Sequence, residues 1–184
     1  MKAKVSSGTQ GVVTRVPEYE LNLVISFKLR DELIARGYQV VMIRETHDVN
    51  ISNIERAKIA TDAGADVFVR IHANGSTDRS VNGILTIGPT RNNPFVSHLY
   101  AQCRALSDDI VNAMVAATGA RNRGVLEMDD MTGINWTTMP VTIVEMGFMT
   151  NPEEDELMQT ADYQQKLVRG IANGIDSYFE RVFA

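Results

Sequence analysis

The sequence predicts a single α/β domain of three layers, in which a mainly parallel, twisted sheet is covered by helices on both faces. Two observations lead to this fold class. Short β-rich runs alternate with amphipathic helical patterns along the chain, and parallel strands need crossover helices between them. In addition, a chain of 184 residues that is 44% hydrophobic suits one compact core and leaves little room for a second.

The first predicted elements are a loop and a helix. Residues 1–17 are rich in Ser, Thr, Gly and Lys, end at Pro17 and show no sustained period, so we interpret them as a loop. As a hypothesis, this loop is the remnant of an insertion, and the domain proper spans residues 18–184. From Glu18 apolar residues recur at helical spacing, and Gly37 stands where a C-terminal cap belongs, which predicts an amphipathic helix.

Strands and helices then alternate. Residues 38–44 form a β-rich run that predicts a short strand, and Ser52 with Glu55 is a capping-box pattern opening a helix that ends near Gly64. The apolar run 66–72 predicts the next strand. The remaining patterns predict strands at 84–88, at 123–128 and around Glu145, a long helix from Phe95 to about Ala117, and a final helix from about Ala161 to Phe179.

Composition excludes several classes of function. The formal net charge is −5, from 18 basic and 23 acidic residues. The sequence has no basic stripe of the kind that binds phosphates, so we expect no nucleic-acid partner. We expect no membrane span and no export signal, because no apolar run is long enough and the N-terminus lacks the blocks of a signal peptide. The single cysteine, Cys103, lies on an apolar helical stripe and is expected to be a buried thiol.

Glu145 is the most informative residue, because it interrupts the apolar run 141–148. A buried, ionised carboxylate needs a partner, and the candidates are a cation, a metal-bound water or a substrate. The alternative is a structural ion pair with Arg70 or Arg123.

Two further residues stand at the ends of predicted elements. His72 closes the strand 66–72, and in open α/β sheets the carboxyl ends of the strands are where ligands bind. Glu18 opens the first helix, where a carboxylate also complements the helix dipole without any function. From spacing alone, these residues do not define a metal site.

Several segments occur together in one order along the chain. They are Pro17-Glu18-Tyr19-Glu20-Leu21-Asn22-Leu23, Asn53-Ile54-Glu55-Arg56, Val69-Arg70-Ile71-His72-Ala73-Asn74, Asn122-Arg123-Gly124-Val125 and Val144-Glu145-Met146-Gly147-Phe148. This series resembles the zinc-dependent N-acetylmuramoyl-L-alanine amidases of the amidase 3 type, over most of the chain from about Pro17 to Phe179.

The resemblance implies roles for three residues. Glu18 and His72 match residues that bind one zinc ion, Zn²⁺, and Glu145 matches the catalytic carboxylate. It also implies that peptidoglycan is the substrate and partner, cut between N-acetylmuramic acid and L-alanine, and therefore an extracellular or cell-wall location. Asn74 and Arg123, polar residues in predicted loops near strand ends, are candidates for substrate binding.

The chain also departs from the family pattern. Family members begin with a strand and a D-P-G-H segment whose His is a further zinc ligand, and no such segment precedes Pro17. We therefore expect a missing first strand and a missing ligand, and hence lower stability or self-association through an exposed sheet edge. His47 is a candidate replacement ligand, whereas His98 is expected at the surface. Arg70 replaces the small polar residue common at its position.

Two other functions stay open at this point. A noncatalytic peptidoglycan-binding or regulatory module would keep the fold without stable metal, and the missing ligand favours it. A metallopeptidase acting on free peptides is the other alternative, because fold and metal chemistry do not fix the substrate.

Overall fold

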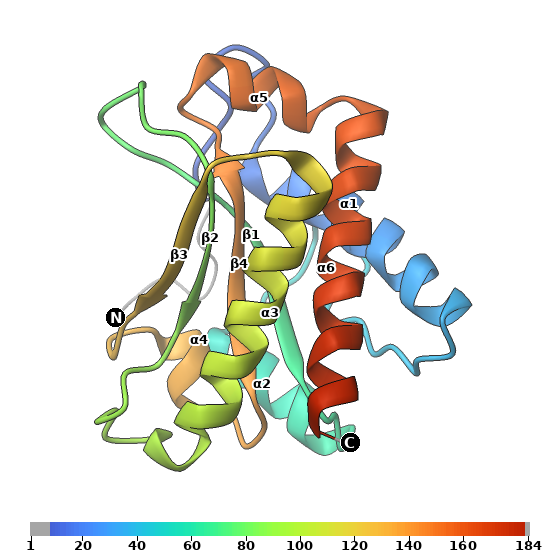
Figure 1. The fold of residues 1–184 in the computed structure, drawn as a ribbon, viewed down its shortest axis with the longest axis vertical. Helices are drawn as coiled ribbons and strands as arrows, with labels where there is room; N and C mark the ends of the chain where they lie inside the picture. Colours follow the sequence, from blue (N-terminus) through green and yellow to red (C-terminus); the bar gives the residue numbers. More distant parts are fainter. Residues whose placement is uncertain (1–7, 183–184) are drawn as a thin grey trace.

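The computed structural model describes residues 8–182, which fold around a four-stranded sheet (Figure 1). In spatial order its strands are β1 (Phe68–Asn74), β4 (Val141–Phe148), β2 (Ile84–Gly88) and β3 (Asn122–Glu127). The pairs β1–β4 and β2–β3 are parallel, and β2–β4 is antiparallel. The sheet is therefore mixed but mostly parallel, and the predicted fold class is confirmed.

Helices cover both faces of the sheet. Helices α1 (Glu18–Ala35), α3 (Tyr100–Thr118) and α6 (Ala161–Val182) pack together on one face (Figure 1). Helices α2 (Asn53–Asp62) and α4 (Thr132–Asn135) contact each other on the opposite face. The short helix η1 (Ser97–Leu99) precedes α3, and α5 (Pro152–Met158) follows β4. None of the helices in this part of the chain is long and apolar enough to cross a membrane.

The predicted ends of the first two helices are confirmed. Gly37 has φ +92°, a conformation that ends α1 without the strain a side chain would bring. At the start of α2, Ser52 Oγ accepts a hydrogen bond from Glu55 N at 3.2 Å, and Glu55 Oε2 accepts one from Ser52 N at 2.7 Å. This reciprocal capping box fixes where α2 begins.

Close helix packing on one face depends on two glycines of α6. A Cβ at Gly174 would lie 2.4 Å from Ile110 Cα, and one at Gly170 would lie 2.6 Å from Met114 Cα. The backbones of α3 and α6 therefore approach more closely than side chains would allow. Cys103 on α3 is fully buried, as predicted.

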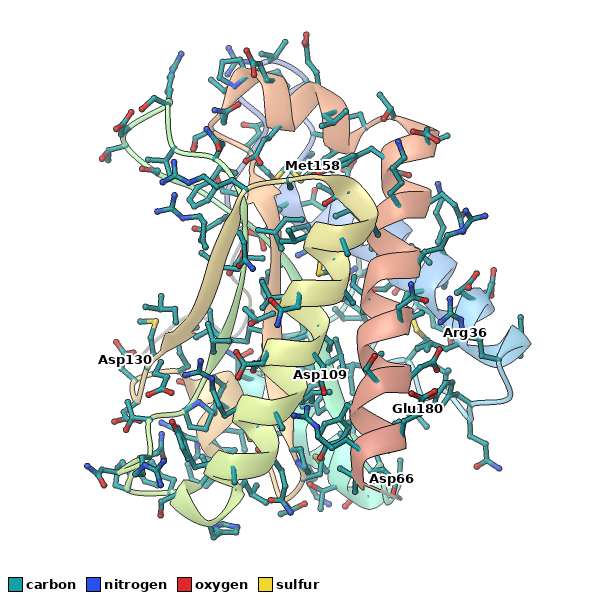
Figure 2. All side chains as sticks on the ribbon, viewed as in Figure 1. Arg36, Asp66, Asp109, Asp130, Met158 and Glu180 are labelled. Atoms are coloured by element: carbon teal, nitrogen blue, oxygen red, sulfur yellow. The ribbon has the colours of Figure 1, made fainter. Side chains whose placement is uncertain are left out.

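An ion pair joins α1 to α6 at the surface. Arg36, just after α1, donates to Asp176 of α6 at 2.6 Å and also pairs with Glu32 (Figure 2). The contact fixes the end of α1 opposite Glu18.

The prediction of a strand at residues 38–44 is wrong. This segment forms no regular ladder, and a cavity of about 1180 Å³ lies between it, α1 and β1. Extended backbone becomes a strand only when a neighbour accepts and donates its hydrogen bonds, and no strand among residues 8–182 adjoins this segment. We call this space the central cavity.

Candidate active site

Glu18, His72 and Glu145 all line the central cavity. His72 on β1 and Glu145 on β4 are partners across the parallel ladder, which places their side chains at neighbouring positions. Glu18 reaches them from the first turn of α1, and His72 Nδ1 lies 2.8 Å from Glu18 Oε1. The structure thus brings together three residues that are far apart in the sequence.

Glu18 is only 8% exposed and is held by several donors. Thr9 N donates to Oε2 at 2.9 Å, and Asn22 Nδ2 donates to Oε1 at 3.0 Å. Burial alone would raise the pKa of Glu18, but the hydrogen bond and charge of His72, together with these donors, lower the pKa below its ordinary value. Glu18 therefore stays ionised in the site, as a metal ligand must be.

A loop of residues 8–17 places the start of α1, and the rest of the predicted N-terminal loop, residues 1–7, lies outside the described residues. Thr9 O accepts a hydrogen bond from Glu18 N at 3.0 Å, so the loop runs directly beside the carboxylate. Asp155 of α5, which is fully buried, anchors the loop by accepting bonds from Val13 N at 2.7 Å, Thr14 N at 2.9 Å and Thr14 Oγ1 at 2.6 Å. Asp155 therefore supports the site from a distance, a role that sequence reasoning missed.

Glu145 differs from Glu18 in its surroundings. Its Oε2 is buried and meets no hydrogen-bond partner among the residues described. Burial, followed by the charge of Glu18, raises the pKa of Glu145 to about 8. The carboxyl group therefore gains or loses a proton near neutral pH.

The structural alternative for Glu145, an ion pair with one of two arginines, does not form within residues 8–182. Arg70 donates to Asn53 Oδ1 at 2.7 Å, and Arg123 donates to Asn82 O at 3.3 Å. A carboxyl group that is buried without a cation fits a site that is completed by another species.

A zinc ion would find part of a ligand set here. A carboxylate and an imidazole are zinc ligands, and Glu18 and His72 lie in contact. Within the described part of the chain, no group of three His, Cys, Asp or Glu residues is close enough to hold a metal. The donor types fit zinc, and Glu18 and His72 would supply two of the three protein ligands that a catalytic zinc site usually has.

The other two histidines do not complete the set in this structure. His47 lines the central cavity, but it packs edge-on against Tyr19 with ring centroids 5.3 Å apart, and its Nδ1 lies 3.5 Å from Arg44 Nη1. His98 in η1 is exposed, as expected.

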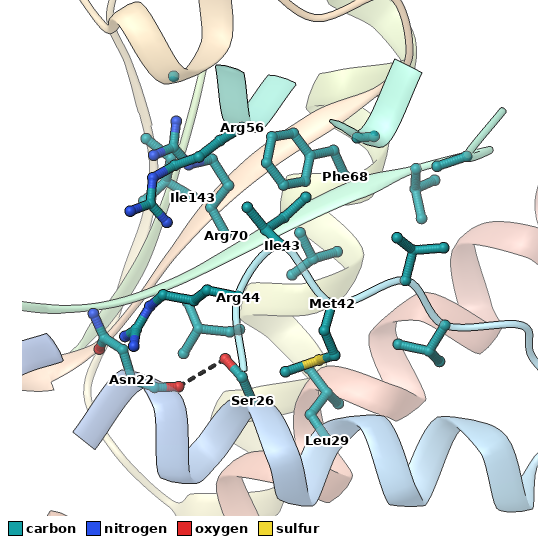
Figure 3. A pocket seen from close by; sticks show the side chains of 18 of the residues that line it. Asn22, Ser26, Leu29, Met42, Ile43, Arg44, Arg56, Phe68, Arg70 and Ile143 are labelled. Atoms are coloured by element: carbon teal, nitrogen blue, oxygen red, sulfur yellow. Dashed lines mark hydrogen bonds between the residues drawn. The ribbon is translucent and has the colours of Figure 1, made fainter. Parts of the chain in front are cut away.

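Three arginines, Arg44, Arg56 and Arg70, also line the central cavity, and we call them the arginine cluster (Figure 3). Burial lowers the pKa of each, and the charge of Arg56 lowers the pKa of both others further. The pKa of Arg70 falls to about 10, so all three stay charged at neutral pH. Of these three residues, sequence analysis singled out only Arg70, because it replaces the small polar residue common at its position in the family.

The two candidate substrate-binding residues lie away from this group. Asn74 ends β1, where its Oδ1 accepts a bond from Gly75 N at 2.8 Å. Arg123 lies on β3 at the far edge of the sheet, with its guanidinium 5.5 Å from the Phe148 ring centroid. Neither residue lines the central cavity, and substrate binding by either stays a prediction.

Comparison with known proteins gives consistent results. Residues 3–177 match the model of a family described as N-acetylmuramoyl-L-alanine amidase (Amidase_3). The chain is 32% identical to the N-acetylmuramoyl-L-alanine amidase LytC of Bacillus subtilis over 162 residues, which are 88% of this chain and 31% of LytC. It is also 32% identical over 164 residues to the uncharacterised B. subtilis protein YqiI, covering 89% of this chain and 75% of YqiI.

A solved structure agrees with these matches. The crystal structure of an N-acetylmuramoyl-L-alanine amidase from Clostridium difficile 630 superimposes with a TM-score of 0.85 at 30% identity. The alignment covers 95% of this chain and 90% of that one. The structural similarity therefore extends over nearly all of the chain.

Proposed function

The chain belongs to the N-acetylmuramoyl-L-alanine amidase family, and we propose that it hydrolyses the amide bond between N-acetylmuramic acid and L-alanine in peptidoglycan, with zinc as cofactor. The observation that best supports this proposal is the contact between Glu18 and His72 beside the unpaired carboxyl group of Glu145. The substrate implies a site of action outside the cell or in the cell wall.

Glu18 and His72 would hold the metal. Their present hydrogen bond holds the carboxylate and the imidazole side by side, and the donors from Thr9 and Asn22 fix the carboxylate in place. When bound, zinc makes water acidic enough to act as a nucleophile near neutral pH.

Glu145 would carry the proton. A general base works best when its pKa lies near the working pH, and burial brings the pKa of Glu145 to about 8. Its carboxylate takes a proton from the attacking water and returns it to the nitrogen of the leaving L-alanine. Glu145 lines the central cavity, and no hydrogen bond within residues 8–182 ties its buried Oε2, so the carboxyl group can exchange a proton with a water in the cavity.

Hydrolysis of intact muropeptides by the purified chain tests the proposal. Glu145→Gln should lower the rate by about 10²- to 10⁴-fold, the usual contribution of a general acid–base group, while Glu156→Gln, at an exposed position on α5, should leave it unchanged. Free stem peptides assayed in parallel separate an amidase from a metallopeptidase. A full rate in Glu145→Gln would disprove the assigned role.

A second candidate is a noncatalytic module that binds peptidoglycan or regulates its cleavage. The observation that favours it is the lack of a third ligand in the described part of the chain. Zinc analysis after dialysis against metal-free buffer separates the two functions: about one zinc per chain supports the amidase, and no retained zinc with intact binding of muropeptides supports the module.

A further inference from the structure

The arginine cluster takes no part in the mechanism above, yet it lies in the same cavity. Its members come from three separate segments: Arg44 from the stretch before α2, Arg56 from α2 and Arg70 from β1. Figure 3 shows their side chains reaching the same region of the cavity. Three cations held this close repel one another, and without a compensating anion the arrangement is costly.

The surroundings compensate the cluster only in part. Arg44 donates to two backbone carbonyls, of Tyr19 at 2.6 Å and of Thr46 at 3.0 Å. Arg70 donates to Asn53 Oδ1. Within residues 8–182 the Arg56 guanidinium makes no hydrogen bond, and only the backbone N–H of Arg56 donates, to Ser52 O at 3.0 Å. A guanidinium carries five N–H groups, so most donors of Arg56 and Arg70 remain available.

Carboxylates are present in the cavity wall but do not pair with the cluster. Asp66 and Asp130 line the cavity together with Glu18 and Glu145. Within the described residues, none of them lies within ion-pair distance of Arg44, Arg56 or Arg70. The cluster therefore presents net positive charge to whatever enters.

The position of Arg70 is fixed by its neighbours. A Cβ on Gly133 of α4 would overlap Arg70 Nη1, so the glycine leaves the space that the guanidinium occupies. Asn53 holds the same group at Nη2, and the Phe68 ring centroid lies 5.7 Å from Cζ. The guanidinium is thus held in one place before any ligand arrives, which lowers the entropic cost of binding.

We propose that Arg56 and Arg70, assisted by Arg44, bind a carboxylate of the substrate peptide. This carboxylate belongs to the second residue, which follows the L-alanine whose amide bond the proposed amidase reaction cleaves. The proposal rests on the proposed function and names the part of the substrate that this site recognises. Arginine is suited to the task, because its planar N–H groups match a carboxylate.

The spacing supports this assignment. Arg70 and His72 are two residues apart on β1, so their side chains emerge on the same face about 7 Å apart. In an extended peptide, the second residue lies about 3.8 Å beyond the first, and its side chain can extend a carboxylate over the remaining distance. A scissile amide at His72 and Glu145 would therefore place a carboxylate of the second residue near Arg70.

Binding measurements with two compounds test the proposal. The probes are N-acetylmuramoyl-L-alanyl-D-glutamate and the same compound with both carboxylates converted to primary amides. Each is titrated calorimetrically into the Glu145→Gln chain, which prevents turnover. We expect the acid to bind about 10-fold more tightly than the diamide, as charge-assisted hydrogen bonds provide.

Substitutions then assign the preference to the cluster. Arg70→Ser and Arg56→Gln, each in the same background, should reduce the preference to about 2-fold or less. Arg104→Gln is the matched control, because Arg104 pairs with Asp108 and Glu127 away from the cavity, and it should keep the full preference. Circular dichroism and thermal melts check that each variant is folded. If Arg70→Ser does not fold, the test relies on Arg56→Gln.

The outcomes separate this proposal from the proposed function. Equal binding of acid and diamide, no binding of either at millimolar concentration, or a preference retained in both arginine variants would overturn the carboxylate subsite. Hydrolysis of the two compounds by the chain that retains Glu145 is measured separately. If the chain cleaves the compounds but binds acid and diamide equally, the carboxylate subsite alone is refuted. If it binds the acid more tightly but cleaves neither compound, the amidase activity alone is refuted.

Discussion

The unpaired carboxyl group of Glu145 should make the stability of the metal-free chain depend on pH, and Glu145→Gln should remove that dependence. Glutamine has the same shape and no charge to bury. The pKa of Glu145 is raised from an ordinary 4.5 to about 8, mainly by burial. A shift of this size corresponds to about 5 kcal/mol at full burial, and partial exposure of the side chain reduces the expected effect to about 2–3 kcal/mol.

The sign follows from proton binding. Below pH 4.5 Glu145 is protonated in both the folded and the unfolded chain, so it carries no penalty. Between pH 4.5 and about 8 the unfolded chain ionises while the folded chain keeps its proton, and the free energy of unfolding falls as pH rises. The substitution should therefore change little at pH 4.5 and stabilise the fold by about 2–3 kcal/mol at pH 8.5.

Urea denaturation at pH 4.5, 6.5 and 8.5, with a chelator present, measures this difference. The chelator matters because a bound cation would favour the ionised carboxylate and hide the effect. Glu156→Gln, at an exposed position on α5, is the control and should give a small, pH-independent change. A stability difference between the unsubstituted chain and the Glu145→Gln variant that is constant across this range, or that shrinks as pH rises, would refute the reasoning.

Three further predictions concern the loop beside the site, the packing of α6 and the proposed metal ligand His72. Asp155→Ala should lower the free energy of unfolding by about 2–4 kcal/mol, because it leaves the loop donors at Val13 and Thr14 without their buried acceptor; urea denaturation measures it, and a loss below about 0.5 kcal/mol would contradict it. Gly174→Ala should cost about 1–3 kcal/mol by forcing α6 away from Ile110, seen as a lower melting temperature; an unchanged one counts against the packing argument. His72→Ala should abolish zinc retention in elemental analysis, whereas retention of one zinc per chain would place the ligands elsewhere.

Local patterns predicted most elements of the fold and drew attention to Glu18, His72 and Glu145, whose roles were implied by the family resemblance and stay predictions. The capping box at Ser52 and Glu55 depends on residues three apart, and the start of α1 at Glu18 depends on a run of helical spacing, so both are visible in a short window. His72 and Glu145 stood out because polar residues interrupted or ended apolar strands. Parallel pairing of β1 with β4 then places them side by side.

Features that depend on distant contacts could not be predicted in this way. Asp155 lies 141 and 142 residues from the loop groups it binds, and its local sequence shows only an acidic first turn of α5. The arginine cluster likewise joins three segments that no sequence window contains. Arg70 was recognised as unusual, but its neighbours in space follow only from the fold.

The segment 38–44 shows why β-propensity did not suffice. Its side chains satisfy the requirements of a half-buried strand, since Tyr38 and Val40 pack against the core while Val41 is 53% exposed. A strand also needs a backbone neighbour, and here the central cavity lies between this segment and β1. Propensity therefore identified residues that can form a strand. Because no strand among residues 8–182 pairs with them, they stay irregular and form one wall of the cavity that Glu18, His72 and Glu145 also line.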